Sequence, residues 1–227
     1  MRTDSIEDRA GVAAVELAGR LGWRHVRLAD VAEEADTDLG GLRAVARDKT
    51  DLLRHFLAGM DRDVLSEDSG FTAEDSVRDR LFDLLMRRFD ALAPYKDGVR
   101  AVMADVVRDP FTVVRLAPDG PASLAWYLEA AGVGTDGPAG MVRAHGLAAV
   151  WLAALRVWVR DESPDLAPTM KALDQALARA EQAAGWLSGV RGGRRRGDPN
   201  DRQAPADWTD QPDPAAPPPG EGVSAEG

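Results

Sequence analysis

Apolar positions in residues 1–60 recur at the spacing of short helices. The first series is Ile6, Ala10, Ala13, Leu17 and Leu21, and Gly22 ends it. A second short helix is predicted over residues 28–35, a tight break over 36–38 and a third helix over 39–46. Asp48 can cap a fourth helix, which carries Leu52, Leu53, Phe56 and Leu57. Helix, short helix, three-residue turn and short helix is the helix-turn-helix pattern, which narrows the fold and leaves the function open.

The next segments also follow a helical period. Thr72 is the predicted N-cap of a long helix, with Asp75 as a weak capping-box partner, and Pro94 ends that helix. Its apolar stripe is Val77, Leu81, Leu85, Phe89 and Leu92, widened by Phe82 and Met86. Shorter helices are predicted over residues 96–108, 110–116 and 121–131.

Residues 138–160 form the most apolar segment, and they are apolar on two faces. One face carries Met141, His145, Ala148, Leu152, Leu155 and Val159, and the other carries Leu147, Trp151, Ala154 and Trp158. A helix that is apolar on two faces is buried on two faces. Within a small domain this pattern indicates a core on one side and a partner subunit on the other.

The last predicted helix begins near Pro168 and has a coiled-coil-like seam. The seam residues are Met170, Leu173, Leu177, Ala180, Ala184 and Leu187. Two consecutive helices of this kind predict a homodimer joined through a four-helix bundle. The predicted interface residues are Leu155, Trp158, Leu173, Leu177 and Ala184.

The composition of the chain bounds its class. With 227 residues, 44% of them hydrophobic, the chain can bury a sizeable core. No apolar run reaches the roughly 18 residues of a membrane span, and the charged N-terminus has no signal-peptide core, so we expect a cytoplasmic protein without integral membrane association. The chain has no cysteine, and its histidines (His25, His55 and His145) are isolated, so we expect no metal site and no cofactor.

The charge balance counts against a nucleic-acid function without excluding it. The net charge is −10, and residues 1–60 contain nine Arg or Lys against eleven Asp or Glu. Nucleic-acid binders usually show a basic footprint, because phosphate neutralisation dominates their affinity. A dimer can still concentrate a few arginines on one face.

The order of helices resembles the TetR family of bacterial transcriptional regulators, most clearly over residues 10–57. The matching features are Leu-Ala-Asp-Val-Ala-Glu-Glu-Ala at 28–35, Gly40, Leu42 and the step from Lys49 to Leu52. The resemblance implies an all-α protein with a three-helix helix-turn-helix domain (1–47) and a larger helical domain for ligand binding and dimerisation (48–190). Residues 191–227 have seven prolines, six glycines and no periodicity, and are predicted to be a disordered tail. The function implied is a ligand-responsive regulator that binds double-stranded DNA as a homodimer.

The reading helix departs from this family's pattern. Asp36 stands where the family usually has glycine, Gly41 near a usual threonine or serine, Arg43 at a usual tyrosine, and Val45-Ala46 at a usual histidine-phenylalanine pair. Base readout needs donors and acceptors at groove edges, and Arg43 is the one long polar side chain on this helix. The candidate DNA-binding residues are Arg27, Arg43, Arg47 and Lys49. A helix-turn-helix that is retained only as a scaffold remains the alternative.

A second family is similar in general pattern over residues 77–90 and 158–174. It comprises the TetR-fold, lipid-binding accessory proteins of ubiquinone biosynthesis, which lack typical DNA-reading residues and end in an amphipathic membrane helix. No such helix is predicted in the Pro/Gly-rich tail of this chain. The alternative function is therefore lipid or quinone binding without DNA binding.

The chain shows no nucleophile elbow, phosphate loop or paired-carboxylate motif, so we expect no enzyme. A pocket for a small apolar ligand or lipid is a stronger candidate. The candidate pocket residues are Phe82, Met86, Trp126, Tyr127, His145 and Trp151. Aromatic and methionine side chains also fill ordinary cores, and His145 can be a core histidine bonded to a backbone carbonyl, so both interpretations stay open.

Overall fold

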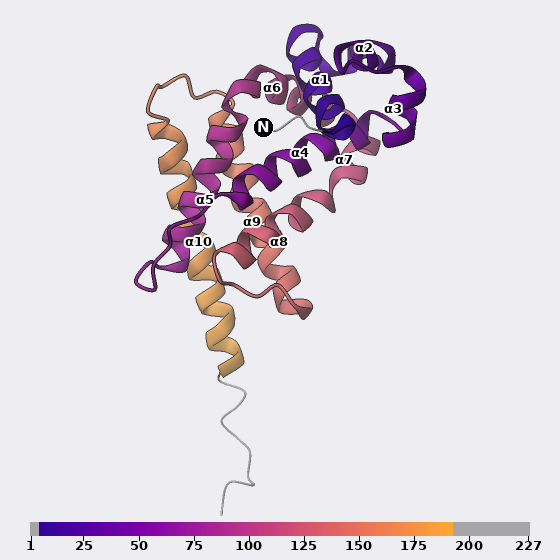
Figure 1. Cartoon of the computed structure of the whole chain (residues 1–227). Helices are drawn as coiled ribbons and strands as arrows, with labels where there is room; N and C mark the ends of the chain where they lie inside the picture. Colours follow the sequence, from indigo (N-terminus) through magenta and orange to yellow (C-terminus); the bar gives the residue numbers. More distant parts are fainter. Residues whose placement is uncertain (1–4, 193–227) are drawn as a thin grey trace, which may run out of the picture. The chain divides into compact units, whose positions relative to one another are not determined.

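The computed structural model describes residues 5–192 of the chain, and the side chains of residues 5–183. This part of the chain is helical and contains no strand, so the predicted all-α class is confirmed. The helices are α1 (Ile6–Leu21), α2 (Leu28–Glu34), α3 (Leu39–Val45), α4 (Lys49–Ser66), α5 (Val77–Leu92), α6 (Lys96–Val106), α7 (Pro110–Leu116), α8 (Asp119–Ala130), α9 (Gly137–Trp158) and α10 (Ala167–Gly192), with 3₁₀ helices η1 (Trp23–His25) and η2 (Ala93–Tyr95) (Figure 1). The predicted tail lies outside the described residues from 193 onward.

The first helices begin and end where the sequence supplies caps. Gly22 ends α1 with a φ of 84°, in the left-handed region that favours glycine. The Asp38 carboxylate accepts the amide hydrogen of Gly41 at 2.7 Å and so caps α3. The Asp48 carboxylate accepts the amide hydrogen of Thr50 at 2.8 Å and caps α4. The predicted helix-turn-helix unit, α1 to α3, is therefore present.

One predicted helix start is wrong. α5 begins at Val77, and its cap is Ser76, whose hydroxyl accepts the amide hydrogen of Asp79 at 3.1 Å. Thr72 and Asp75 do bond, with 2.7 Å between the Thr72 nitrogen and the Asp75 carboxylate, but they close a turn in the preceding loop. Two capping patterns follow one another here, and local sequence does not decide which one starts the helix.

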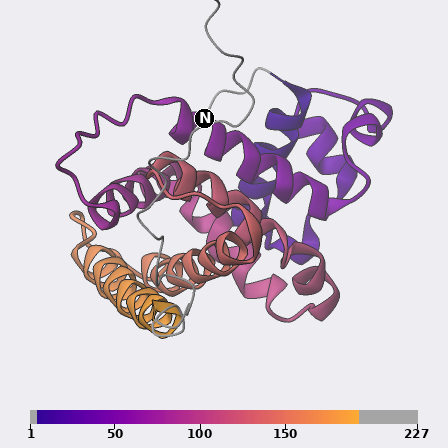
Figure 2. The ribbon, with the colours of Figure 1, turned by 90° about the horizontal axis from the view of Figure 1, so that it is seen from below.

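Helix α1 lies against both α4 and α6, and two glycines permit the close approach (Figure 2). A Cβ added to Gly11 would lie 2.6 Å from the backbone nitrogen of Phe56 on α4. A Cβ added to Gly98 on α6 would lie 2.2 Å from the carbonyl oxygen of Val15. The helix-turn-helix unit is therefore packed tightly on the rest of residues 5–187.

The core of the larger part is aromatic at its centre. Phe89 on α5 stacks on Trp151 and Trp158 of α9, with ring centroids 4.4 and 5.5 Å apart. Leu173 and Leu177 bring α10 into the same core, and an ion pair of 2.5 Å joins Arg78 of α5 to Asp174 of α10. None of the helices in residues 5–192 combines the length and apolar character that crossing a bilayer requires.

Candidate nucleic-acid interface

The α2–turn–α3 segment presents one face to solvent. Leu42 anchors α3 in the core, whereas Leu39, Gly40, Arg43 and Ala44 are exposed. Arg27 is also exposed, at the N-cap position of α2. Within the described residues, the side chains of Arg27 and Arg43 form no hydrogen bond or ion pair. Both guanidinium groups are therefore free to meet an anion.

Arg47 is exposed but already paired. Its Nε lies 2.8 Å from the carboxylate of Asp51, and Arg54 reaches the same carboxylate at 2.8 Å. The bond from Arg47 is the main reason that the pKa of Asp51 lies far below its ordinary range, and burial opposes it only in part. Arg47 consequently brings little net positive charge to this face.

Lys49 points into the protein. Its ammonium group donates to the carbonyl oxygens of Trp23 and Val26, at 2.5 and 3.0 Å, and lies 4.6 Å from the centre of the Trp23 ring. Burial lowers the pKa of Lys49. In this arrangement Lys49 holds α4 to η1, and it does not share the exposed face of Arg27 and Arg43.

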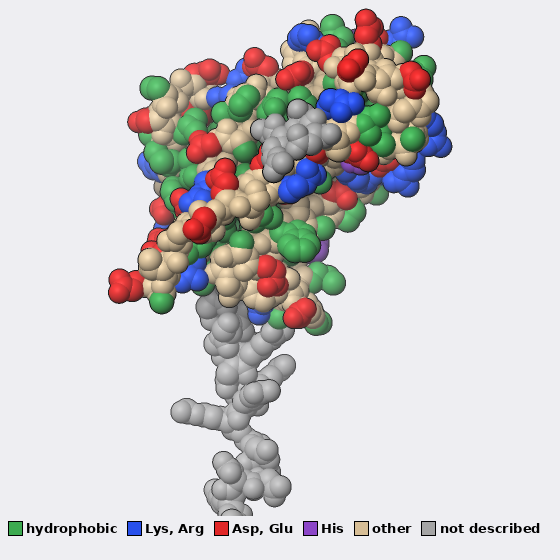
Figure 3. Space-filling view, in the orientation of Figure 1, with side chains coloured by type: hydrophobic (Ala, Val, Ile, Leu, Met, Phe, Trp, Pro, Cys, Tyr) green, Lys and Arg blue, Asp and Glu red, His purple; other side chains and the backbone are tan. Residues whose placement is uncertain are grey.

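Acidic side chains lie close to the reading face. Asp36 and Asp38 are exposed in the turn, and Glu33 and Glu34 are exposed at the end of α2. Asp36 has a φ of 52°, in the left-handed region, which gives a physical reason for the glycine expected at this position. In Figure 3, Lys and Arg side chains gather at the edge where α3 and α7 lie, whereas several acidic ones cover the top of α1 and α2. The four predicted DNA-binding residues therefore do not form one continuous basic stripe.

Ion pairs join the start of α4 to α7 and α8. Asp48 pairs with Arg115 at 2.6 Å, and Arg54 pairs with Asp119 at 2.8 Å. Arg54 also donates to the carbonyl oxygen of Arg115 at 2.8 Å. The N-terminal end of α4, which follows α3 directly, is thus tied to the helices behind it.

A buried polar network lies farther along α4. Asp61 accepts hydrogen bonds from Tyr127 at 2.9 Å and from Ser123, and it pairs with Arg88 at 3.0 Å. Arg88 is 3% exposed, and its guanidinium carbon lies 4.6 Å from the centre of the Trp151 ring. Among the described residues, its Nε and Nη1 have no hydrogen-bond acceptor. Sequence analysis missed this network, although a lone arginine within the apolar stripe of α5 was a usable signal.

The predicted pocket residues lie in different environments. Tyr127 and Trp151 are buried beside Arg88, and Phe82 and Met86 are half-buried on α5. His145 is exposed on α9, where its Nδ1 donates to the carbonyl oxygen of Met141 at 2.9 Å. The structure therefore does not place His145 in the core with Tyr127 and Trp151.

Trp126 is 67% exposed and lines a groove of about 440 Å³ between α4 and α8. The apolar lining of this α4–α8 groove is Leu57, Ala58, Leu65, Ala122 and Trp126. Asp61 and Ser123, two members of the buried network, also line it. The groove thus connects an apolar surface with the polar core.

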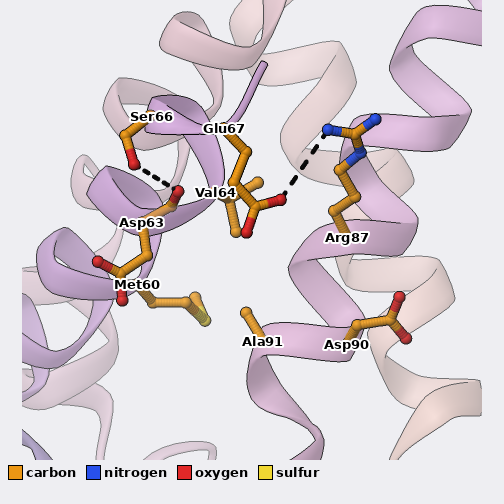
Figure 4. A pocket seen from close by; sticks show the side chains of 8 residues that line it. All are labelled: Met60, Asp63, Val64, Ser66, Glu67, Arg87, Asp90 and Ala91. Atoms are coloured by element: carbon orange, nitrogen blue, oxygen red, sulfur yellow. Dashed lines mark hydrogen bonds and ion pairs between the residues drawn. The ribbon is translucent and has the colours of Figure 1, made fainter. Parts of the chain in front are cut away.

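A second groove, of about 540 Å³, lies between α4 and α5 (Figure 4). Met60, Val64 and Ala91 give it an apolar part, and its charged residues are Asp63, Glu67, Asp90 and Arg87. Arg87 lies 3.9 Å from Glu67 and 2.8 Å from Asp83. None of the predicted pocket residues lines this second groove.

The predicted interface residues are already covered within one chain. Leu155, Trp158, Leu173 and Leu177 are all buried, and the side chain of Ala184 lies outside the described set. The large apolar side chains that remain exposed on α9 are Met141, Val142 and Leu152. On α9 the exposed surface is therefore the outer side of the helix, and the predicted interface residues Leu155 and Trp158 are buried within one chain.

Three solved structures are similar to this chain. A TetR transcriptional regulator from Nitrosomonas europaea ATCC 19718 has a TM-score of 0.62 and 24% identity, over 79% of this chain and 99% of that chain. A Rhodococcus sp. protein assigned to the TetR family has a TM-score of 0.52 and 20% identity, over 78% and 96% of the two chains. A TetR transcriptional regulator from Rhodococcus sp. RHA1 has a TM-score of 0.50 and 21% identity, over 74% and 93%. No protein-family model and no curated protein matches the sequence.

These similarities show a TetR-like fold, as the resemblance over residues 10–57 implied. They extend over most of this chain and nearly all of each solved structure, so the likeness includes the helices behind the helix-turn-helix unit. At these identities the likeness concerns the fold, and function has to be argued from the residues of this chain.

Proposed function

We propose that this chain is a TetR-type transcriptional regulator that binds double-stranded DNA as a homodimer and responds to a small apolar effector. The observation that carries the proposal is the exposed, unpaired pair Arg27 and Arg43 on a helix-turn-helix of TetR-like fold. Arg27 precedes α2 and Arg43 lies on α3, the two elements through which this motif meets DNA. A few unpaired arginines at the right place matter more for local binding than the net charge of −10.

The position of α4 supports effector response. Its N-cap Asp48 pairs with Arg115 and its Arg54 pairs with Asp119, and farther along the helix Asp61 belongs to the buried network. An apolar molecule in the α4–α8 groove would contact Trp126 and lie next to Asp61 and Ser123. Such a ligand would favour a different position of α4 only if it bound the two positions with different affinity. A shift of α4 would move α3 relative to its symmetry mate and change DNA affinity.

The exposed face of α9 supports the homodimer. Met141 and Leu152 lie on the same side of this long helix, and they are 63% and 44% exposed within one chain. A second copy related by twofold symmetry would cover this face with the same residues. Two helix-turn-helix units would then meet two half-sites.

The alternative, a lipid-binding accessory protein of quinone metabolism, gains no support. The three similar structures are described as transcriptional regulators.

The test is DNA binding by the purified full chain, using duplex from the gene's own upstream region and random duplex at two salt concentrations. We expect the wild-type protein to prefer the upstream duplex. In a plot of log affinity against log salt concentration, each phosphate contact that a variant loses should make the slope shallower by about 0.9. Arg27→Ala should reduce the slope, and Arg43→Ala should also weaken the sequence preference. Arg179→Ala, which removes an exposed arginine from α10, is the matched control. Equal, weak binding to both duplexes together with co-purified lipid or quinone would reject the regulator.

A further inference from the structure

The outward surface of α3 is largely apolar. Leu39 is 57% exposed in the first turn, while Leu42 one turn later is buried and anchors the helix. Gly40 and Ala44 are also exposed, and neither has a long side chain. Two charged side chains lie on this surface. One is Arg43, and the other is the capping residue Asp38, whose carboxylate accepts a hydrogen bond from the Gly41 amide.

The spacing of the two long side chains matches the spacing of bases. Leu39 and Arg43 are four residues apart, so they lie on the same side of the helix. Four residues rise about 6 Å along an α-helix, which is close to two base-pair steps of about 3.4 Å. The small residues Gly40 and Ala44 let the helix backbone approach the floor of the major groove without a clash.

The chemistry of these side chains selects particular base edges. The 5-methyl group of thymine is the apolar feature of the major groove, and leucine and alanine side chains can bury it. The two nitrogens of the arginine fork match O6 and N7 of guanine. A leucine has no donor or acceptor with which to read any other edge.

We infer that α3 reads its half-site mainly by apolar contact: Leu39 and Ala44 recognise thymine methyl groups, and Arg43 recognises one guanine about two steps away. This inference rests on the proposed DNA-binding function. It replaces the polar readout expected of a helix-turn-helix with a thymine-methyl readout. In this arrangement, the apolar side chains of α3 are the residues that select the DNA sequence.

The experiment uses duplexes enriched from a random pool by the full-length wild-type protein. Each thymine of the enriched sequence is replaced in turn by deoxyuridine, which removes only the methyl group. We expect one or two positions per half-site at which the wild type loses about fourfold in affinity, as expected for burial of one methyl group. For one of these positions, the Leu39→Ala variant should have the same affinity for the duplex with thymine as for the duplex with deoxyuridine.

Two controls make the outcome specific. Leu21→Ala removes the same side chain from a 48% exposed position on α1, and it should retain the wild-type sensitivity to deoxyuridine. Leu39 is exposed, so its substitution should leave the melting temperature nearly unchanged. Sequence-specific binding without any deoxyuridine effect, or with an effect that Leu39→Ala preserves, would overturn the inference while leaving the regulator intact. Failure to enrich any sequence would instead overturn the proposed function and this inference with it.

Discussion

At the scale of single residues, the ammonium group of Lys49 stabilises the junction between η1 and α4. It donates to two backbone carbonyls and lies over the ring of Trp23. Lys49→Met should lower the free energy of unfolding by about 1–3 kcal/mol, because a hydrogen bond from a charged donor contributes about that much. The measurement is urea denaturation at neutral pH.

The Lys49→Met variant also tests whether Lys49 has a structural role or contacts DNA. If Lys49 does not touch phosphate, Lys49→Met should leave the salt slope of DNA binding unchanged. Arg43→Ala should show the opposite pattern, with near-normal stability and an altered slope. A reduced slope for Lys49→Met at full stability would show that Lys49 leaves its carbonyl partners to bind DNA.

Asp161 is the carboxylate whose titration should be visible in the stability of the protein. Ser163 and Thr169 each donate from a backbone nitrogen at 3.0 Å and also from their hydroxyls. Burial alone would raise the pKa of Asp161, but these four hydrogen bonds outweigh it and lower the pKa from 3.8 to about 2. The pKa is therefore lower in the folded than in the unfolded chain. Its stabilising contribution is complete above about pH 4 and is lost as the pH falls toward 2.

Asp161→Asn should therefore destabilise the protein at pH 6 by about 1–2 kcal/mol, since an amide can accept on one side only. The difference from wild type should narrow steadily between pH 4 and pH 2.5. Urea midpoints across this range measure the effect, and Asp136→Asn, at a position where no side-chain cap bond forms, is the control. A difference that stays constant with pH would refute the role given to the four hydrogen bonds.

At the scale of helices, local signals predicted most of the architecture. Gly22, Asp38 and Asp48 end or cap helices through bonds within a few residues, so the sequence alone places the first four helices well. Thr72 and Ser76 carry equivalent local signals, and in the structure it is Ser76 that caps α5. Boundaries are therefore predictable where one cap is present and ambiguous where two compete.

The candidate site was less predictable because it depends on contacts distant in sequence. Lys49 lies at the start of a helix, where exposure is the usual expectation, yet its partners are carbonyls more than twenty residues away. Arg88 and Asp61 come from different helices and pair only in the folded protein. Periodicity states which face of a helix is apolar, but it does not state whether that face meets its own chain or a partner. Leu173 and Leu177, which periodicity predicted at an interface, are buried within one chain.

The contact between α1 and α6 gives a prediction at this scale. Alanine normally stabilises a helix by about 1 kcal/mol relative to glycine. At Gly98 the added Cβ would lie 2.2 Å from the carbonyl oxygen of Val15, so α6 would have to move away from α1. We expect Gly98→Ala to lower the free energy of unfolding by about 1–3 kcal/mol.

Gly120→Ala is the matched control, because its Cβ on α8 would meet nothing within 4 Å. It should be neutral or stabilise the protein by up to about 1 kcal/mol. Thermal melts of both variants provide the comparison. A stabilised Gly98→Ala would mean that α1 and α6 are not packed as closely as the backbone contact indicates.

At the scale of the whole molecule, the proposed function depends on pairing two helix-turn-helix units. One chain carries few unpaired arginines on its reading face and a net charge of −10, so single-site affinity should be weak. Linking two weak sites raises the overall affinity by about 10²–10⁴-fold without new contacts. Under the proposed function, dimerisation is thus as important for DNA binding as the composition of α3.

The outer face of α9 supplies the test of that pairing. Leu152 is 44% exposed in one chain, so Leu152→Glu should leave the fold intact while placing a charge in the proposed interface. We expect a folded monomer by light scattering at micromolar concentration, with the DNA affinity reduced at least tenfold, as loss of bivalent binding predicts. Leu177→Glu should instead prevent folding, because Leu177 is buried within the chain, and Val77→Glu on α5 should have neither effect. A Leu152→Glu protein that remains dimeric would place the interface elsewhere. An unmodified protein that is monomeric at the same concentration would remove the basis for bivalent DNA binding.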